Sequence, residues 1–300
     1  MSTKDASGNG ETVAAPRFAS RYRDFSPSAN RPRMPISVPL KAGRSLFARC
    51  MKFCGVVLSC VLAIVVLLTG NASAIEGGAE IADGKYPWHV KVGNPADGYC
   101  SGSLVSARHI LTAAHCVAKE VHTPDWMFAH FLGLPPPFTG FRVRVVRTER
   151  HPAGVNDARK ADIALLTLEY PVIVRPVSLV ASGDSLHTRP GSKVTVAGYG
   201  ETGEQSETGR SARELVFKAT DTCARTGRQW FCADAPSRDS GIRPGDSGGP
   251  AFTETTENGE VRYVLLGTSS NHRGANTWFA NLSLPVFNDW IRDVSGTSAM

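Results

Sequence analysis

The sequence predicts an all-β fold that ends in a short helix, and three observations support this prediction. First, the chain has 29 Gly and 19 Pro among its 300 residues, which supplies many turn positions. Second, short β-like runs recur after residue 75, with turn residues at close intervals. Third, no helical periodicity separates these runs, so a βαβ arrangement is excluded and a barrel or sandwich is favoured.

Four stretches give the clearest strand signal, and several of them alternate apolar and polar side chains. They are residues 88–92 (WHVKV), 141–147 (FRVRVVR), 192–200 (SKVTVAGYG) and 261–270 (VRYVLLGTSS). Residues 135–137, which are three prolines, and residues 201–210 are predicted to form exposed loops. Near the carboxyl end, Val286, Trp290 and Ile291 have the spacing of a short amphipathic helix.

An apolar segment over residues 53–68 predicts an export signal. It holds sixteen residues without a charge, and Ala72-Ser73-Ala74 follows it with the small-x-small pattern that signal peptidase recognises. A membrane-spanning helix needs about 20 apolar residues, so a cleaved signal peptide is favoured over a retained membrane anchor. We therefore expect cleavage near Ala74–Ile75 and a secreted, extracellular or periplasmic protein.

The basic charge of the chain lies in its leader. Residues 1–74 contain ten Lys/Arg and three Asp/Glu and carry +7, whereas the remainder has 23 basic and 24 acidic residues and carries −1. The body of the protein therefore gives no sign of nucleic-acid binding. Residues 1–52 form a polar leader typical of disorder, and residues 53–74 hold the apolar region and cleavage site. Translation starting at Met51 would leave residues 1–50 untranslated and give a 24-residue leader of the usual proportions.

Four cysteines follow the leader, and an even number in an exported domain predicts two disulfides. They are Cys100, Cys116, Cys223 and Cys232. Four cysteines allow three pairings, and the residues alone do not choose between them. Neither pair has the C-x₂₋₄-C spacing of a zinc site, so we expect no metal and no cofactor.

The hexapeptide Gly245–Pro250 (GDSGGP) is the first candidate for chemistry. A serine between glycines can occupy a tight turn that exposes its hydroxyl group and directs backbone N–H groups toward one point. Acyl transfer needs both, because the nucleophile must be accessible and the oxyanion must be stabilised. On its own, such a run is more often an ordinary turn.

A serine nucleophile needs a base, and the base needs a carboxylate to orient it. His115 lies in an apolar segment next to Cys116, where a satisfied core histidine is the competing interpretation. Asp162 precedes the apolar run 163–166, where burial of its charge requires a partner. The competing interpretation of Asp162 is the surface end of a strand.

These segments, in this order, resemble the three catalytic segments of the chymotrypsin/trypsin family of serine proteases. They are Leu111–Cys116 (LTAAHC), Asp162–Leu166 (DIALL) and Gly245–Pro250 (GDSGGP). Further segments are similar to the same family and extend the resemblance over residues 75–300, the predicted protease domain. They are Ile75–Gly78 (IEGG), Tyr86–Val90 (YPWHV), Cys100–Ser106 (CSGSLVS), Ala197–Gly200 (AGYG) and Asp289–Ile291 (DWI).

The resemblance implies two packed six-stranded antiparallel β-barrels with the active site between them. It implies that His115 is the general base, Asp162 its orienting carboxylate and Ser247 the nucleophile. The backbone N–H groups of Gly245 and Ser247 would form the oxyanion hole. The family pattern also selects the disulfides Cys100–Cys116 and Cys223–Cys232.

The resemblance pairs a free amino terminus at Ile75 with Asp246 as the activating contact. In this family an Arg or Lys usually precedes that isoleucine, whereas here Ala74 precedes it and ends the predicted signal-peptidase site. We therefore expect export itself to create the active terminus. Glu76 is a second departure, because a small aliphatic residue is usual there.

The predicted specificity pocket departs from the family at two nearby positions. Arg243 stands where a disulfide cysteine is common, so we expect the pocket wall to be held by packing. Gly241 stands where trypsin-like members carry the aspartate that selects Arg or Lys. Together with the neighbouring Ile242, it predicts an apolar or small substrate residue.

The sequence thus predicts a monomeric serine endopeptidase that acts on proteins or peptides and is open to protein inhibitors. Two alternatives stay open. One is a catalytically inactive homologue that serves as a binding module, and the other is the same protease held at a membrane by an uncleaved leader.

Overall fold

The computed structural model describes residues 75–94, 98–117, 127–138, 140–154, 157, 160–200 and 211–297. The predicted leader, over residues 1–74, and the predicted loop, over residues 201–210, lie outside these ranges. Within them, no helix is long and apolar enough to cross a membrane.

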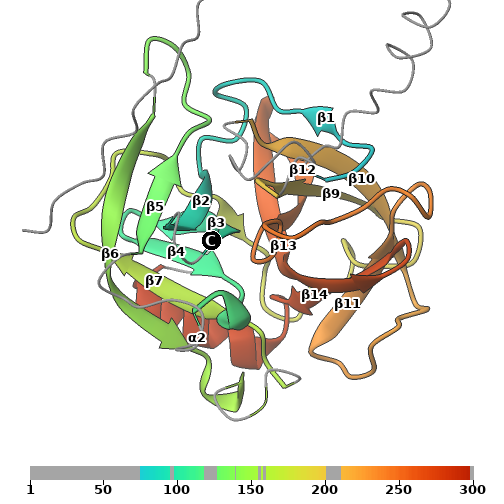
Figure 1. Ribbon diagram of the computed structural model, residues 1–300. Helices are drawn as coiled ribbons and strands as arrows, with labels where there is room; N and C mark the ends of the chain where they lie inside the picture. The colour runs from blue at the N-terminus through green and yellow to red at the C-terminus, as the bar shows by residue number, and fades with distance from the viewer. Residues whose placement is uncertain are drawn as a thin grey trace, which may run out of the picture. The chain divides into compact units, whose positions relative to one another are not determined.

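The first half of the described chain forms a closed barrel of six antiparallel strands in the order β2-β3-β4-β7-β6-β5 (Figure 1). The strands are β2 (His89–Asn94), β3 (Gly98–Ser106), β4 (His109–Thr112), β5 (Phe128–Phe131), β6 (Phe141–Arg150) and β7 (Ala164–Leu168). Strand β6 shows why the alternation was informative, because Val143 and Val145 are buried in the barrel while Arg144 between them is exposed.

The second half forms another barrel, in which β9-β10-β11-β14-β13-β12 follow one another and β12 pairs back with β9. Its strands are β9 (Lys193–Gly198), β10 (Arg213–Thr220), β11 (Trp230–Asp234), β12 (Pro250–Glu257), β13 (Glu260–Arg273) and β14 (Asn276–Asn281). Two short strands extend it, since β1 (Ala79–Glu80) pairs with β10 and β8 (Ser178–Leu179) runs parallel to β13. The predicted pair of six-stranded antiparallel barrels is therefore confirmed.

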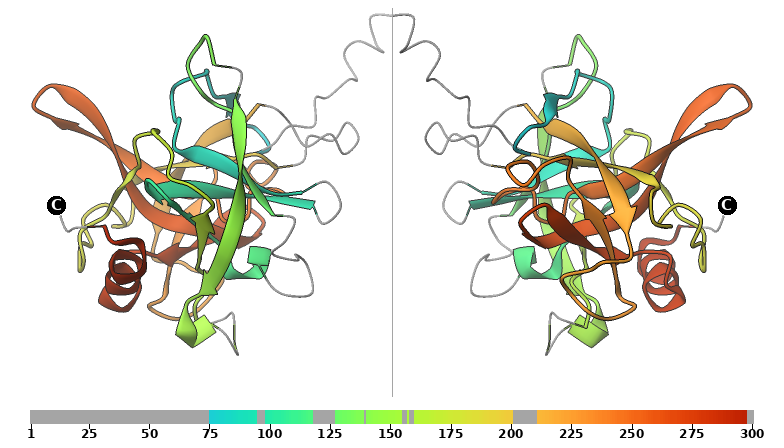
Figure 2. Two further views of the ribbon diagram at one scale, coloured as in Figure 1. Left: turned by 90° about the vertical axis from the view of Figure 1, so that its left-hand side faces the viewer. Right: turned by 90° about the vertical axis from the view of Figure 1, so that its right-hand side faces the viewer.

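The long strands β12 and β13 form a hairpin that projects from its barrel, as the orange ribbon in Figure 2 shows. At its tip, Asn258 and Gly259 both have positive φ, which lets two residues reverse the chain. The base of the same hairpin enters the barrel, where Phe252 and Leu265 are buried. The predicted strand over residues 261–270 is thus the middle of a longer element.

The chain ends in helix α2 (Pro285–Ser295), as predicted, but its buried face differs from the prediction. Pro285 occupies the first turn and Gly296 ends the helix with a positive φ of 67°. Phe287 and Ile291 are buried, whereas Val286 is 58% exposed. The apolar spacing correctly predicted the helix, but Val286 does not lie on the face of the helix that packs against the protein.

Both disulfides predicted from the resemblance are present. Cys100 in β3 is bonded to Cys116, and Cys223 after β10 is bonded to Cys232 in β11. The first closes a loop with a sequence separation of 16 residues, for which the chain-entropy model gives roughly 3 kcal/mol of stabilisation. It fixes the segment that follows β4, next to the predicted catalytic histidine.

The aromatic core of the second barrel generates a stability prediction. Phe279 is fully buried and its ring stacks on Phe231 with centroids 5.0 Å apart. Phe279→Ala should lower the free energy of unfolding by about 3–5 kcal/mol, because it leaves a cavity. Chemical denaturation measures the change. Val261→Ala is the control, since Val261 is half exposed and its loss should change stability by under about 0.5 kcal/mol. Equal effects of the two substitutions would contradict the core assignment.

Candidate active site

The three residues of the predicted triad line one cleft of about 370 Å³, and both barrels contribute to it. His115 and Asp162 belong to the first barrel, whereas Ser247 and Ser270 belong to the second. The remaining lining residues are Arg225, Ile242, Arg243, Pro244, Asn271 and His272. The sequence motifs are far apart along the chain, and the packing of the barrels brings them together.

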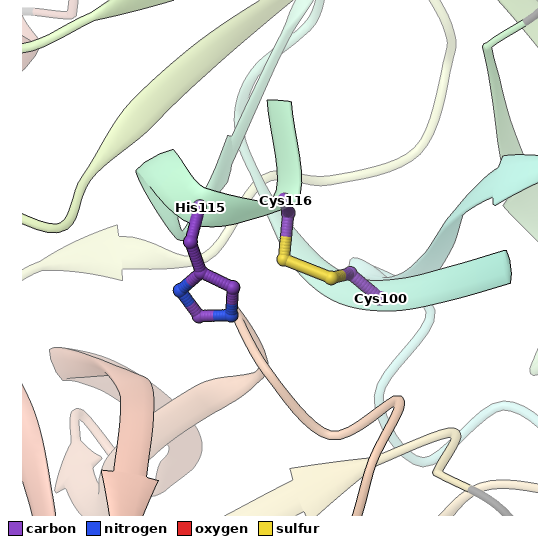
Figure 3. A group of neighbouring side chains, drawn as sticks. All are labelled: Cys100, His115 and Cys116. Atoms are coloured by element: carbon purple, nitrogen blue, oxygen red, sulfur yellow. A yellow bond between two sulfur atoms is a disulfide. The ribbon is translucent and has the colours of Figure 1, made fainter. Parts of the chain in front are cut away.

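His115 lies in a short 3₁₀ helix, η1 (Ala114–Val117), directly after β4. Figure 3 shows its imidazole beside the Cys100–Cys116 disulfide, which ties η1 to β3. The two sulfurs are bonded to each other, so this group offers no thiolate to a metal. The imidazole itself has 42% of its side-chain surface exposed, which leaves it accessible from the cleft.

Asp162 is almost fully buried and accepts three hydrogen bonds. His115 Nδ1 lies 2.8 Å from its Oδ2, the backbone N–H of His115 donates to its Oδ1 at 3.0 Å, and Ser270 Oγ donates to its Oδ2 at 2.6 Å. Burial raises the pKa of Asp162, but the bonds from His115 and Ser270 outweigh it and hold the pKa below its usual value. The carboxylate is therefore ionised and fixed in orientation.

The contact with Asp162 also shifts the pKa of His115. Burial lowers the pKa of this imidazole, but the hydrogen bond and negative charge of Asp162 outweigh burial and raise it above its ordinary value. The arrangement favours the tautomer with a proton on Nδ1, which leaves Nε2 free to accept a proton. Among the described residues, Ser247 Oγ makes no hydrogen bond to this ring.

The turn that carries Ser247 leaves two backbone donors unused. Asp246 N–H donates to Arg243 C=O at 3.0 Å, and Gly248 N–H donates to Ser269 C=O at 2.8 Å. Among the described residues, the N–H groups of Gly245 and Ser247 have no acceptor. Gly245 has φ 94°, a conformation that a side chain would strain. The geometry therefore supplies a pair of donors where an oxyanion hole is predicted.

Ser101 of β3 holds this turn to the first barrel through two hydrogen bonds. Its N–H donates to Ser247 C=O at 2.8 Å, and its hydroxyl donates to Gly245 C=O at 2.9 Å. The hydroxyl also accepts the N–H of Tyr199 at 2.9 Å. Thr112 Oγ1 completes the network by donating to Ser101 C=O at 2.8 Å. One buried residue thus fixes the carbonyl groups of Gly245 and Ser247, the two residues that flank Asp246.

Asp246, which directly precedes Ser247 in this turn, is completely buried. Its carboxylate accepts the backbone N–H groups of Arg243 at 2.7 Å, Gly200 at 2.8 Å and Ile75 at 3.3 Å. A Cβ atom at Gly198 or Gly200 would overlap this carboxylate, so both positions require glycine. Burial raises the pKa of Asp246 to about 6 in spite of these bonds.

Two departures from the family pattern are in contact with each other. The side chains of Glu76 and Arg243 form an ion pair. The backbone reinforces it, because Glu76 N–H donates to Gly241 C=O at 2.9 Å and Gly241 N–H donates to Glu76 C=O at 3.0 Å. The pocket wall at Gly241–Arg243, for which packing alone was predicted, is therefore also attached to the amino-terminal segment by this ion pair and these hydrogen bonds.

The predicted specificity residues divide into two roles. Ile242 is buried and lines the cleft beside Pro244. Gly241 uses its backbone for the bridge to Glu76 and has φ 138°. Among the residues that line the cleft, Asp162 is the single carboxylate, and Gly241 is not one of them.

Several functional residues were missed from the sequence. Ser270 and Ser101 belong to no catalytic motif, and their partners lie 108 and 144 residues away. The segment Cys100–Ser106 was noticed only as part of the resemblance. Nothing in the sequence around Arg225 pointed to the cleft.

Comparisons with known proteins agree with this geometry. A family model described as Trypsin matches residues 75–291. Granzyme M of Rattus norvegicus is 27% identical over 235 residues, which cover 74% of this chain and 89% of that protein. Granzyme M of Homo sapiens is 27% identical over 266 residues, or 80% and 99% of the two chains. Glucanase inhibitor protein 1 of Phytophthora infestans is 31% identical over 236 residues, or 74% and 88%.

The hydroxyl of Ser101 can be tested against a matched serine of the same strand. Ser101→Ala should cost about 1–3 kcal/mol of unfolding free energy, because Gly245 C=O and Tyr199 N–H lose a buried partner. Ser103 is equally buried in β3, but its hydroxyl has no partner among the described residues, so Ser103→Ala should be nearly neutral. Urea denaturation compares the two, and equal losses would contradict the assigned network.

Asp246 predicts a pH dependence of stability. An acid whose pKa is raised in the folded state binds more protons folded than unfolded, so stability present at low pH is lost as pH rises. With residue 74 still attached, the wild-type chain should lose about 3 kcal/mol relative to Asp246→Asn between pH 3.8 and about 6. Denaturation of both chains across this range measures the difference. Parallel pH curves would exclude a raised pKa.

Proposed function

The chain belongs to the trypsin family of serine proteases, and from this premise we propose that it is a serine endopeptidase. Residues 75–300 would form its protease domain. The observation that carries the proposal is the buried Asp162 bound to His115, with Ser247 in the same cleft. Each of the two barrels supplies part of this constellation, which supports the roles that the motifs imply.

In the proposed reaction, Ser247 Oγ attacks the carbonyl carbon of the scissile peptide bond while His115 Nε2 takes its proton. The imidazolium is stabilised by Asp162 and then gives the proton to the leaving amine, which leaves an acyl group on Ser247. Water hydrolyses this ester by the reverse sequence of proton transfers. The free N–H groups of Gly245 and Ser247 would bind the oxyanion, and one such donor contributes about 3–4 kcal/mol.

Activation would occur when the leader is removed between Ala74 and Ile75. The new ammonium group at Ile75 would lie against Asp246, whose carboxylate already accepts the N–H of Ile75 in the continuous chain. A positive charge there lowers the pKa of a buried carboxyl group, so the terminus would keep Asp246 ionised at neutral pH. Because the predicted signal-peptidase site ends at Ala74, we propose that secretion itself produces the active enzyme.

The preferred substrate would have an apolar or small side chain before the scissile bond. Ile242 presents an apolar side chain to the cleft, and Gly241 leaves the predicted pocket base without an aspartate. The substrates would be proteins or peptides outside the cell, and the enzyme would act as a monomer.

A binding module without catalysis is the second candidate, because one relative carries the name Glucanase inhibitor protein 1. The presence of Ser247, His115 and Asp162 in one cleft favours the enzyme. Retention of the leader as a membrane anchor would change the location of the protein, and a separate cleavage before Ile75 would then be needed for the proposed activation.

The two candidates differ in the reactivity of Ser247. A fluorescent organophosphonate should label the processed wild type and leave Ser247→Ala unlabelled, because only an activated serine attacks the phosphorus atom. An unlabelled wild type would favour the binding module.

Asp162→Asn should remain folded and lower kcat by about 10⁴-fold, since the imidazole loses the partner that fixes its tautomer.

Activation by leader removal predicts a difference between two amino termini. A chain processed to Ile75 should be active, whereas a chain with Ala74 retained should be at least tenfold less active, since its Ile75 nitrogen is an uncharged amide. Amino-terminal sequencing of the secreted protein, followed by a peptide hydrolysis assay on both forms, measures this. Secreted active protein with any other first residue would rule the scheme out.

A further inference from the structure

The segment after β10 that leads into the active-site cleft is fixed from several sides. Its disulfide joins Cys223 to Cys232 in β11. The side chain of Asn276 binds on both sides of Cys223, since its Nδ2 donates to Thr222 C=O at 2.9 Å and its Oδ1 accepts the N–H of Ala224 at 2.9 Å. This segment therefore holds the next residue, Arg225, in a defined place.

Arg225 lines the cleft together with Ser247 and His115. Its guanidinium carbon lies 4.7 Å from the centroid of the Trp230 ring, and Trp230 is buried in β11. The guanidinium has five N–H donors in a planar fork, and a cation–π contact does not consume them, so they stay available for a carboxylate.

The other charges that line the cleft are already engaged. Asp162 is the one carboxylate among the lining residues, and it is buried under His115 and Ser270. Arg243 is paired with Glu76. Among the described residues, Arg225 forms no ion pair, so it is the uncompensated cation of the cleft.

We propose that Arg225 forms a subsite for an acidic side chain, Asp or Glu, of the peptide substrate. The guanidinium would bind the carboxylate through two parallel hydrogen bonds, a geometry that gives both energy and orientation. This subsite is distinct from the apolar wall at Ile242, so the favoured peptide combines an apolar residue with an acidic one. The inference rests on the proposed endopeptidase function and adds a substrate class to it.

The experiment uses the full chain, exported and processed by its host, and pairs of fluorogenic peptides that differ by Glu or Gln at a single position around the scissile bond. Wild type should prefer Glu by about tenfold in kcat/KM at one position. The preference should shrink as salt rises from 50 to 500 mM, because the pair is partly exposed. Arg225→Gln should abolish it, and Arg225→Glu should favour Lys at the same position.

Arg228 provides the matched control, because it lies on the same segment, is exposed and is absent from the cleft lining. Arg228→Gln should keep the preference for Glu. Labelling of Ser247 by an organophosphonate shows that each variant still has an intact site, and Arg225→Lys should restore part of the preference if charge is what matters.

The outcomes separate the two proposals. A wild type that is labelled and cleaves peptides, but treats Glu and Gln alike at every position, overturns the acidic subsite and leaves the endopeptidase standing. A preference that survives Arg225→Gln in a labelled enzyme also overturns it. A wild type that is neither labelled nor active contradicts the endopeptidase itself and the subsite with it.

Discussion

A buried carboxylate at the junction of two barrels is the contact on which the rest of this site depends. Asp162 lies at the start of β7 in the first barrel and accepts hydrogen bonds from His115 of the same barrel and from Ser270 of the second. An unpaired charge so deeply buried would be costly, so its partners must be present whenever the protein is folded. The fold thereby guarantees that the imidazole has its orienting partner before any substrate arrives.

The turn that carries Ser247 is also fixed by hydrogen bonds, here those of Ser101 and Asp246. Its peptide carbonyls are held by Ser101 of β3, and Asp246 accepts N–H groups from segments that are distant in the sequence. With these contacts in place, the N–H groups of Gly245 and Ser247 have no acceptor among the described residues, which leaves both available as donors to an oxyanion. The two donors are preorganised because the neighbouring N–H and C=O groups of the turn already have hydrogen-bond partners in the protein.

Near the cleft, two charged residues stand where the family usually has an aliphatic residue and a disulfide cysteine, and these two residues form an ion pair with each other. Glu76 and Arg243 each depart from the family pattern, and each is the ion partner of the other. An exposed ion pair contributes little energy alone, but the backbone bridge between Glu76 and Gly241 fixes its geometry. The cleft wall is thus linked to the segment that leader removal would free.

The sequence by itself determined the all-β class, the motif residues and the short final helix, because turn residues, alternation and short motifs are local patterns. The choice of two barrels over a sandwich came from the family resemblance. The sequence left the cysteine pairing open until a resemblance chose, and it misjudged Val286, since spacing marks a helix more surely than its buried face. Only the tertiary structure decided that Ser270, Ser101, Asn276 and Glu76 support the cleft. Their partners are remote in sequence, and strand register and barrel packing, which no local pattern encodes, bring them within hydrogen-bond distance.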